Sequence, residues 1–230
     1  MNNNEVKVKV WDIPVRVFHW GMLLLLAGLW WSADQGEMSY HQLFAYSLMI
    51  LLVVRLIWGF IGSDTARFSH FVRHPRQALD YLAKMRAKQA PHSLGHNPLG
   101  GYMVVLLLVI ISLQLVSGLF ATDEIFTEGP LVSYVSGETA SWFTWLHKKN
   151  FDLLLILAGI HVAAVLLHRF KGEKLVGAMF SGYKRLPAAE AQQPRFASLM
   201  LALVLLLVVA VPVVHFLMMP VIGMLEVSKH

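Results

Sequence analysis

Residues 145–168 read WLHKKNFDLLLILAGIHVAAVLLH and place His147 and His161 fourteen positions apart in one largely apolar segment. Fourteen residues make close to four turns of α-helix, so both imidazoles project from the same face. At 1.5 Å per residue the two rings stand about 21 Å apart along the helix axis, which is most of the thickness of a bilayer's hydrocarbon core. One membrane helix can therefore offer a metal ligand near each surface.

The composition is that of an integral membrane protein. Of the 230 residues, 57% are hydrophobic and 14% are charged, whereas a soluble domain carries about 25% charged residues. The chain has no cysteine, which excludes disulfides, iron–sulfur clusters and covalently attached c-type haem. Five apolar stretches are long enough, or nearly so, to cross a bilayer. They are residues 15–33, 43–61, 102–121, 145–167 and 196–219.

The basic residues indicate how these spans are oriented. All but four of the 19 Lys and Arg residues lie in the N-terminal segment, the connection between spans two and three, or the connection between spans four and five. The positive-inside rule therefore predicts a cytoplasmic N-terminus and a C-terminus outside. The net charge of +5 is interpreted as a sign of this topology, so we expect contact with membrane lipid and no nucleic-acid partner.

Two local predictions complete the topology. The first span lacks a small-x-small cleavage site, so it is interpreted as a retained helix rather than a secretion signal. Residues of about 75–88 combine apolar positions at helical spacing with a basic face, which predicts an amphipathic helix lying on the cytoplasmic membrane surface.

Two further histidines lie at matching depths on other spans. In the predicted topology His19 lies near the cytoplasmic end of span one, with His161 in the inner half of span four. His41 opens span two on the outside, level with His147. Low-spin haem iron takes two axial ligands, and imidazole serves well. The four histidines therefore suggest two haems stacked across the membrane, with axial pairs His19–His161 and His41–His147. Taken singly, each could instead be an interfacial or hydrogen-bonded histidine.

The inner pair leaves one alternative open. His19 lies three residues from Arg16, whereas His161 lies eight residues from Arg169, so their depths match imperfectly. His168 lies seven residues beyond His161 and shares its face. Helix tilt could absorb the difference, and His168 is the alternative ligand.

These residues resemble the prokaryotic cytochrome b561 family and its relatives, the b-type cytochrome subunits of Ni,Fe-hydrogenases. The resemblance covers about residues 10–183. It rests on Phe18-His19-Trp20, on His41 and Arg55, and on the run from Trp145-Leu146-His147 through Gly159-Ile160-His161 to His168. It implies that His19, His41, His147 and His161 bind the irons of two haem b groups. It also implies a four-helix core and electron exchange with membrane quinones.

The chain departs from the simplest members of that family. It carries a fifth span, a long basic connection between spans two and three, and a large acidic external loop at 122–144. It looks most like members that serve a periplasmic c-type cytochrome. We therefore expect an all-α integral membrane bundle, with a four-helix di-haem domain over 1–183. A linker and an additional transmembrane helix would occupy 184–230.

The leading hypothesis is a di-haem cytochrome b in the bacterial cytoplasmic membrane. It would transfer electrons between quinone and a periplasmic redox partner, such as a c-type cytochrome. One alternative is a stand-alone superoxide:quinone oxidoreductase, with Lys148 and Lys149 attracting the anion. Another is a haem-free transporter or scaffold. Whether the chain is itself an enzyme stays open.

Two further sets of residues are candidates for supporting roles. The arginines that could pair with haem propionates are Arg16, Arg55 and Arg67. The histidines that could transfer quinone protons are His70, His74, His92 and His96. Each set also has a simpler interpretation, as positive-inside anchors for the arginines and as solvated side chains for the histidines.

Overall fold

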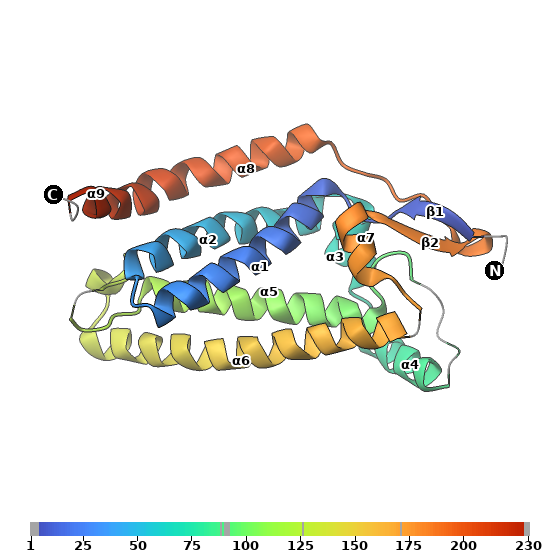
Figure 1. The fold of residues 1–230 in the computed structure, drawn as a ribbon, viewed down its shortest axis with the longest axis horizontal. Helices are drawn as coiled ribbons and strands as arrows, with labels where there is room; N and C mark the ends of the chain where they lie inside the picture. Colours follow the sequence, from blue (N-terminus) through green and yellow to red (C-terminus); the bar gives the residue numbers. More distant parts are fainter. Residues whose placement is uncertain (1–4, 88, 90–92, 126, 171, 228–230) are drawn as a thin grey trace. The chain divides into compact units, whose positions relative to one another are not determined.

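A computed structural model describes residues 5–87, 89, 93–125, 127–170 and 172–227. Its main elements are long apolar helices (Figure 1). Five helical runs are long and apolar enough to cross a membrane. They are α1 (Ile13–Asp34), α2 (Met38–Ile61), α5 (Pro98–Leu119), α6 (Gly137–Phe170) and the run Leu199–Val227. The prediction of an all-α integral membrane helical bundle with five spans is confirmed.

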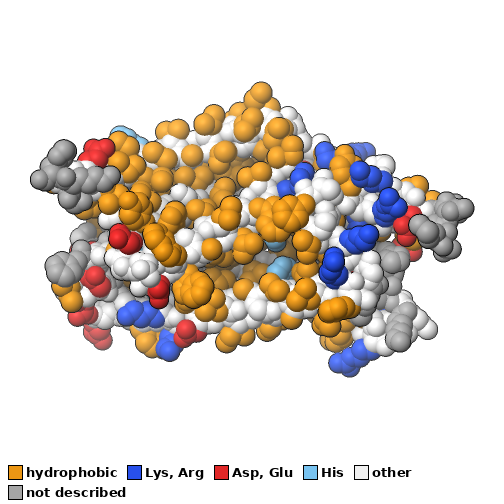
Figure 2. All heavy atoms as spheres, in the orientation of Figure 1, with side chains coloured by type: hydrophobic (Ala, Val, Ile, Leu, Met, Phe, Trp, Pro, Cys, Tyr) orange, Lys and Arg blue, Asp and Glu red, His pale blue; other side chains and the backbone are white. Residues whose placement is uncertain are grey.

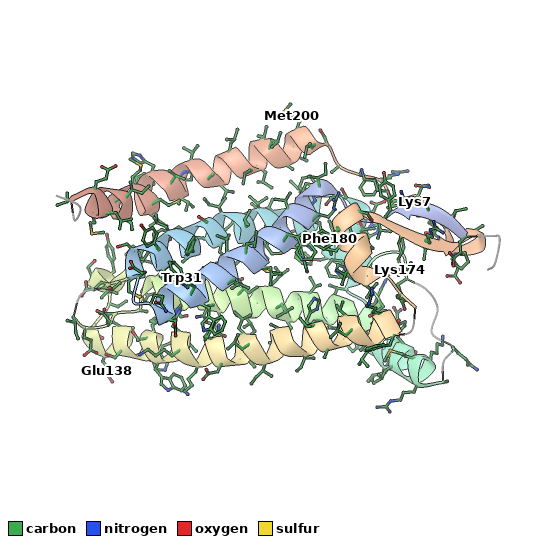
Figure 3. The ribbon with its side chains drawn as sticks, in the orientation of Figure 1. Lys7, Trp31, Glu138, Lys174, Phe180 and Met200 are labelled. Carbon is green, nitrogen blue, oxygen red and sulfur yellow. The ribbon has the colours of Figure 1, made fainter. Side chains whose placement is uncertain are left out.

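The start of α6 corrects the predicted boundary of the fourth span. The helix begins at Gly137, eight residues before the predicted start at 145, so part of the predicted external loop 122–144 is helical. Ser136 caps this end, because its Oγ accepts the backbone N–H of Thr139 at 3.3 Å. Glu138 in the first turn, labelled in Figure 3, complements the helix dipole. The hydrophobic pattern could not show this extension because Glu138, Thr139 and Ser141 interrupt it.

The fifth span is one helical run with an irregular turn. It consists of α8 (Leu199–Val213), the π-helical turn η4 (Val214–Met218) and α9 (Met219–Val227). Pro212 lies inside α8. Proline has no backbone N–H to donate to the preceding turn, and helices adjust to such a residue locally. The irregularity therefore lies next to the residue that disturbs the hydrogen-bond ladder.

By their contacts, the residues group into two compact units. The first comprises Met1–Phe18, Arg55–Leu106 and Ile160–Ala202. The second comprises His19–Val54, Leu107–Gly159 and Leu203–His230.

The first unit contains a small sheet that the sequence did not predict. Strand β1 (Glu5–Lys9) pairs antiparallel with β2 (Tyr183–Pro187), and Val8 is fully buried. Lys7 on β1, labelled in Figure 3, lies over the Tyr183 ring at 4.5 Å. The two strands are far apart in sequence, and each is too short for its alternation of residues to be informative. Basic side chains gather on the surface of this unit in Figure 2.

The first unit also contains ends of the long helices and several short helices. The short helices are η1 (Asp64–Ala66), α3 (Phe68–Phe71), α4 (Pro75–Arg86), α7 (Leu175–Ser181) and η3 (Ala188–Glu190). Helix α4 occupies most of the range in which the interfacial helix is expected, and it buries Ala78 and Tyr81. Its position at a membrane surface stays a prediction.

The second unit contains most of α1 and α2, the second half of α5, the first two thirds of α6 and most of the fifth span, together with η2 (Val132–Tyr134). Leu48 of α2 and Ile111 of α5 are each only 1% exposed and form part of its core. By contrast, Leu24 of α1 is 74% exposed. Outward apolar side chains of this kind are expected where a helix meets lipid tails. Figure 2 shows hydrophobic side chains covering the outer surface of the helices.

Candidate functional site

Two of the predicted ligands, His41 and His147, lie together in the second unit. His41 lies in the first turn of α2 and His147 in the third turn of α6. Their ring centroids are 6.4 Å apart, with the ring planes at 74°. A metal bound by both imidazoles at about 2 Å, through nitrogens about 1 Å from each ring centre, would separate the centroids by about 6 Å. The observed spacing therefore fits one haem iron with two axial histidines.

The orientation of the His41 ring is fixed by α1. Its Nδ1 lies 3.0 Å from the carbonyl oxygen of Leu29 and 3.3 Å from Oγ of Ser32. A carbonyl only accepts hydrogen bonds, so Nδ1 carries the proton and donates it. The lone pair is then on Nε2. A histidine that binds a metal through Nε2 adopts this tautomer.

The His147 ring is held in the same way by α5. Its Nδ1 lies 2.9 Å from the carbonyl oxygen of Gln114 and 3.2 Å from Oγ of Ser117. Ser117 is fully buried. Both rings of the pair therefore use the same combination of a backbone carbonyl and a serine hydroxyl, and both leave Nε2 as the basic nitrogen.

The Gln114 side chain interacts with the nitrogen of His147 that would bind a metal. Its amide nitrogen donates to Nε2 of His147 at 3.1 Å. Asn150 sets the direction of this amide, because its Nδ2 donates to Oε1 of Gln114 at 2.7 Å and to the Ile110 carbonyl at 2.9 Å. The hydrogen bond from Gln114 is consistent with an unprotonated Nε2 in His147. A metal at that nitrogen would take the place of the Gln114 amide.

Gly118 allows α5 to approach the His147 ring. A Cβ added at Gly118 would lie 3.0 Å from Cε1 of His147 and 3.2 Å from its Nδ1. A side chain there would therefore displace the imidazole. Helix α5 contributes no histidine to the site, yet it provides the carbonyl, the hydroxyl and the open space that position one.

The other predicted pair is distributed over both units. His19 belongs to the second unit, where its ring packs edge-on against Trp20 with centroids 5.0 Å apart. His161 belongs to the first unit and is half-buried. The pairing of His19 with His161 therefore stays a prediction.

His168, the alternative ligand, is part of a polar cluster in the first unit. Its Nδ1 lies 3.1 Å from Oε1 of Glu173, and Nζ of Lys184 lies 3.4 Å from the other carboxylate oxygen. Burial alone would raise the pKa of Glu173, but the hydrogen bond from His168 and the charge of Lys184 bring it below its ordinary value. Glu173 therefore stays ionised and keeps the His168 ring oriented.

No group of three or more His, Asp or Glu side chains that could hold a metal ion occurs among the residues described by the structure. This result does not count against haem, because the iron takes four nitrogens from the porphyrin and needs only two axial ligands from the protein. Pairs of histidines on facing helices are the arrangement that this chemistry requires.

The three candidate arginines differ in what they contact. Arg16 donates to two backbone carbonyls at the C-terminal end of α7, one of them at 3.2 Å. Arg67 forms an ion pair with Asp64. Arg55 is only 4% exposed, and its Nη1 has no hydrogen-bond partner among the described residues. Arg55 alone therefore combines deep burial with an unused donor.

The candidate proton-transfer histidines also differ in their surroundings. His70 and His96 line a cavity of about 410 Å³ in the first unit, together with Asp64 and Tyr81. His74 instead caps α4, since its Nδ1 accepts the backbone N–H of Arg76 at 3.3 Å. His92 lies outside the described residues.

Sequence reasoning missed the residues that orient the two rings. Of these, Gln114 and Asn150 could have been found, because polar amides within apolar spans are candidates for a function by default. Ser32, Ser117 and Gly118 gave no such signal, since small residues occur wherever membrane helices pack closely.

A sequence model of a family described as prokaryotic cytochrome b561 matches residues 10–182. The matched region is about three quarters of the chain and contains all four predicted ligands. The fifth membrane helix lies outside it. No curated protein and no solved structure matches the chain.

Proposed function

The chain belongs to the prokaryotic cytochrome b561 family, and we propose that it is a di-haem membrane cytochrome that transfers electrons between quinone and a redox partner outside the cytoplasmic membrane. Family membership supports a b-type haem protein of membrane electron transfer. The finer statements, namely two haems, quinone as one substrate and a periplasmic partner, are the proposal.

The observation that carries the proposal is the His41–His147 pair. The rings lie at the spacing that two axial ligands need, and each donates from Nδ1 to a backbone carbonyl. Such hydrogen bonds fix the tautomer and raise the basicity of the ligand nitrogen. In the proposal these residues hold the outer haem. The bound haem supplies reversible one-electron chemistry, and two strong axial ligands leave no open coordination site.

The inner haem is proposed to lie between His19 on α1 and His161 on α6, the helix that also carries His147. His161 is the ligand that the resemblance implies. The hydrogen bond between Nδ1 of His168 and Glu173 does not decide between the two histidines, because it leaves Nε2 of His168 free. The alternative ligand is therefore part of the test below.

The acidic external loop is the proposed docking site for a basic partner, such as a c-type cytochrome. Gln42, the residue after His41, donates to the Glu128 carbonyl of this loop at 3.0 Å. Glu124, in the same loop, accepts from Ser141 near the start of α6 at 3.0 Å. The loop is thus attached to the two helices that carry the outer pair, and its negative charge would attract a positively charged protein. In this proposal the N-terminus is cytoplasmic and the C-terminus periplasmic.

Haem content tests the proposal directly. We expect a pyridine haemochrome assay on the purified protein to give about two haem b per chain. His147→Ala should give about one, because one iron loses an axial ligand. Of His161→Ala and His168→Ala, only the first should lose a haem. A colourless wild-type protein would overturn the proposal in favour of a haem-free transporter or scaffold.

Reduction kinetics separate the electron carrier from the stand-alone enzyme. We expect quinol to reduce the haems and a basic c-type cytochrome to reoxidise them, in a salt-dependent reaction. Rapid, saturable reduction by superoxide without any partner would instead support the superoxide:quinone oxidoreductase. Lys149 already pairs with Asp152 at 3.5 Å, which weakens the positive surface that this alternative needs.

A further inference from the structure

Arg55 is a buried cation in an apolar helix. It lies on α2, six residues before the helix ends at Ile61, which is about 9 Å or close to two turns. Its side chain is 4% exposed, and Nη1 has no hydrogen-bond partner among the described residues. A charge removed from water without a partner is strongly unfavourable, and ionisable residues within membrane spans face a partner or a functional group.

The nearest acid does not satisfy Arg55. Asp12 is 4% exposed and interacts electrostatically with Arg55. No hydrogen bond or ion pair joins these two described side chains, however, and each carboxylate oxygen accepts from another donor. Oδ1 accepts the backbone N–H of Val15 at 2.8 Å, and Oδ2 accepts the indole N–H of Trp58 at 2.8 Å. Asp12 therefore caps α1 and ties it to α2, while the guanidinium keeps unused donors.

The Phe68 ring limits the directions from which a ligand can approach. The guanidinium carbon lies 5.5 Å from the centre of this ring, so the aromatic group covers a face of the cation. The remaining donors of a guanidinium point outward in its plane, as a fork that matches a carboxylate in a bidentate arrangement. The geometry points to a carboxylate that approaches Arg55 edge-on.

A lipid phosphate fits this position poorly. Phosphates lie at the level of the head groups, whereas Arg55 lies about 9 Å inside the end of its helix and is almost fully buried. The propionates of a haem are carboxylates that enter the bundle with the cofactor. Helix α1, which Asp12 caps, carries the proposed inner ligand His19 seven residues later, about 10 Å along its axis.

We infer that Arg55, and not Arg16 or Arg67, binds a propionate of the inner haem. This inference rests on the proposed function and adds an anchoring residue to it. The carboxylate would complete the coordination of the buried guanidinium by hydrogen bonds. In return, the positive charge would stabilise the reduced, less positive haem.

Redox titration of Arg55→Gln tests this inference. Removing the positive charge that pairs with a propionate should shift the reduction equilibrium of that haem about tenfold, which is the order of magnitude for two unit charges a propionate's length apart at an effective dielectric of about 20. For a one-electron couple this lowers its midpoint potential by about 59 mV. The other haem should keep its potential. Arg55→Lys, which retains the charge, should recover most of the shift. Arg67→Gln is the matched control and should leave both potentials unchanged.

The outcomes separate this inference from the proposed function. A wild-type protein without two haems overturns both. If the wild type contains two haems but the potentials are unchanged in Arg55→Gln and Arg55→Lys, only the inference is overturned. Should Arg55→Gln fail to fold, the neutral variant Arg55→Met decides, and unchanged potentials in that variant would overturn the inference. If Arg55 instead binds a lipid phosphate, nanodiscs containing phosphatidylglycerol should stabilise the wild type more than Arg55→Gln, with no change in either potential.

Discussion

The His41–His147 pair of the second unit and Arg55 of the first unit bury polar groups in different ways. Each histidine of the pair has a carbonyl acceptor for its Nδ1 proton, so the protein alone fixes both rings. Arg55 has an unused donor at Nη1, and the carboxylate of Asp12 forms its hydrogen bonds with Val15 and Trp58 instead. The difference teaches that the outer site is organised before any ligand binds. The site around Arg55 keeps an unused donor among the described residues, which is what the inferred propionate would satisfy.

The largest effect should come from filling the space beside His147. We expect Gly118→Val to reduce haem b from about two per chain to about one, because its Cβ alone would lie 3.0 Å from the imidazole. Haemochrome assay and the absorbance of the α-band would report the loss. Gly223→Val is the matched control, since a Cβ there meets no atom within 4 Å. A Gly118→Val protein with two haems would show that the outer site is less rigid than its hydrogen bonds indicate.

The next effect should come from the acid beside Arg55. Asp12→Ala removes the cap of α1 and leaves the Trp58 N–H without its acceptor, which together should cost about 2–4 kcal/mol. It also removes the negative charge of Asp12, which acts on Arg55. Thermal unfolding in detergent should therefore show a clear drop for Asp12→Ala. Asp80→Ala, at an exposed position on α4, is the control and should change the midpoint little. Equal stability of the two variants would mean that the first unit does not depend on Asp12.

The sequence predicted the five spans because a run of about 20 apolar residues is a strong signal in a membrane protein. It also brought His41 and His147 to the same depth, and the structure places their rings 6.4 Å apart. Their role as ligands stays a prediction. The parts of the fold that the sequence did not predict depend on contacts between distant segments. Pairing of β1 with β2 joins the first strand to residues near position 185, and no local pattern encodes it.

The residues around the candidate ligands were also not predictable from local sequence patterns. Nothing in the sequence of α5 distinguishes Ser117 from any other small residue in a membrane helix, although it lies against His147. Likewise, Arg16, Arg55 and Arg67 are equivalent as basic residues beside apolar spans. Only their contacts and burial distinguish them. Arg16 donates to backbone carbonyls, and Arg67 pairs with Asp64 although its Nε is unused. Arg55 is 4% exposed and has no ion pair among the described residues.

A smaller effect should follow from the serines that support the outer pair. We expect Ser32→Ala and Ser117→Ala each to retain two haems, because the backbone carbonyl still accepts the Nδ1 proton. The lost interaction should cost about 0.5–1.5 kcal/mol. Electron paramagnetic resonance should show a shifted low-spin signal for one haem in the double variant. Ser112→Ala is the control, since its hydroxyl bonds within α5 to Leu108. Loss of a haem in either single variant would show that the carbonyls alone do not fix the rings.

The smallest effect concerns the link between η1 and the segment before the fifth span. Asp64 accepts the Arg195 backbone N–H at 2.9 Å, which is the main reason that the pKa of Asp64 falls below its ordinary value of 3.8. Arg67 lowers it further. A carboxyl whose pKa is lower in the folded state stabilises that state above the unfolded pKa, and the contribution is lost as the pH falls through the folded value.

We therefore expect Asp64→Asn to cost about 1 kcal/mol at pH 7 and almost nothing near pH 2. Thermal unfolding of both proteins across this range measures the difference, and a gap that persists at pH 2 would exclude the carboxylate as its cause. Because Asp64 is already satisfied by protein groups, this change should leave both haem potentials unaltered, in contrast to Arg55→Gln.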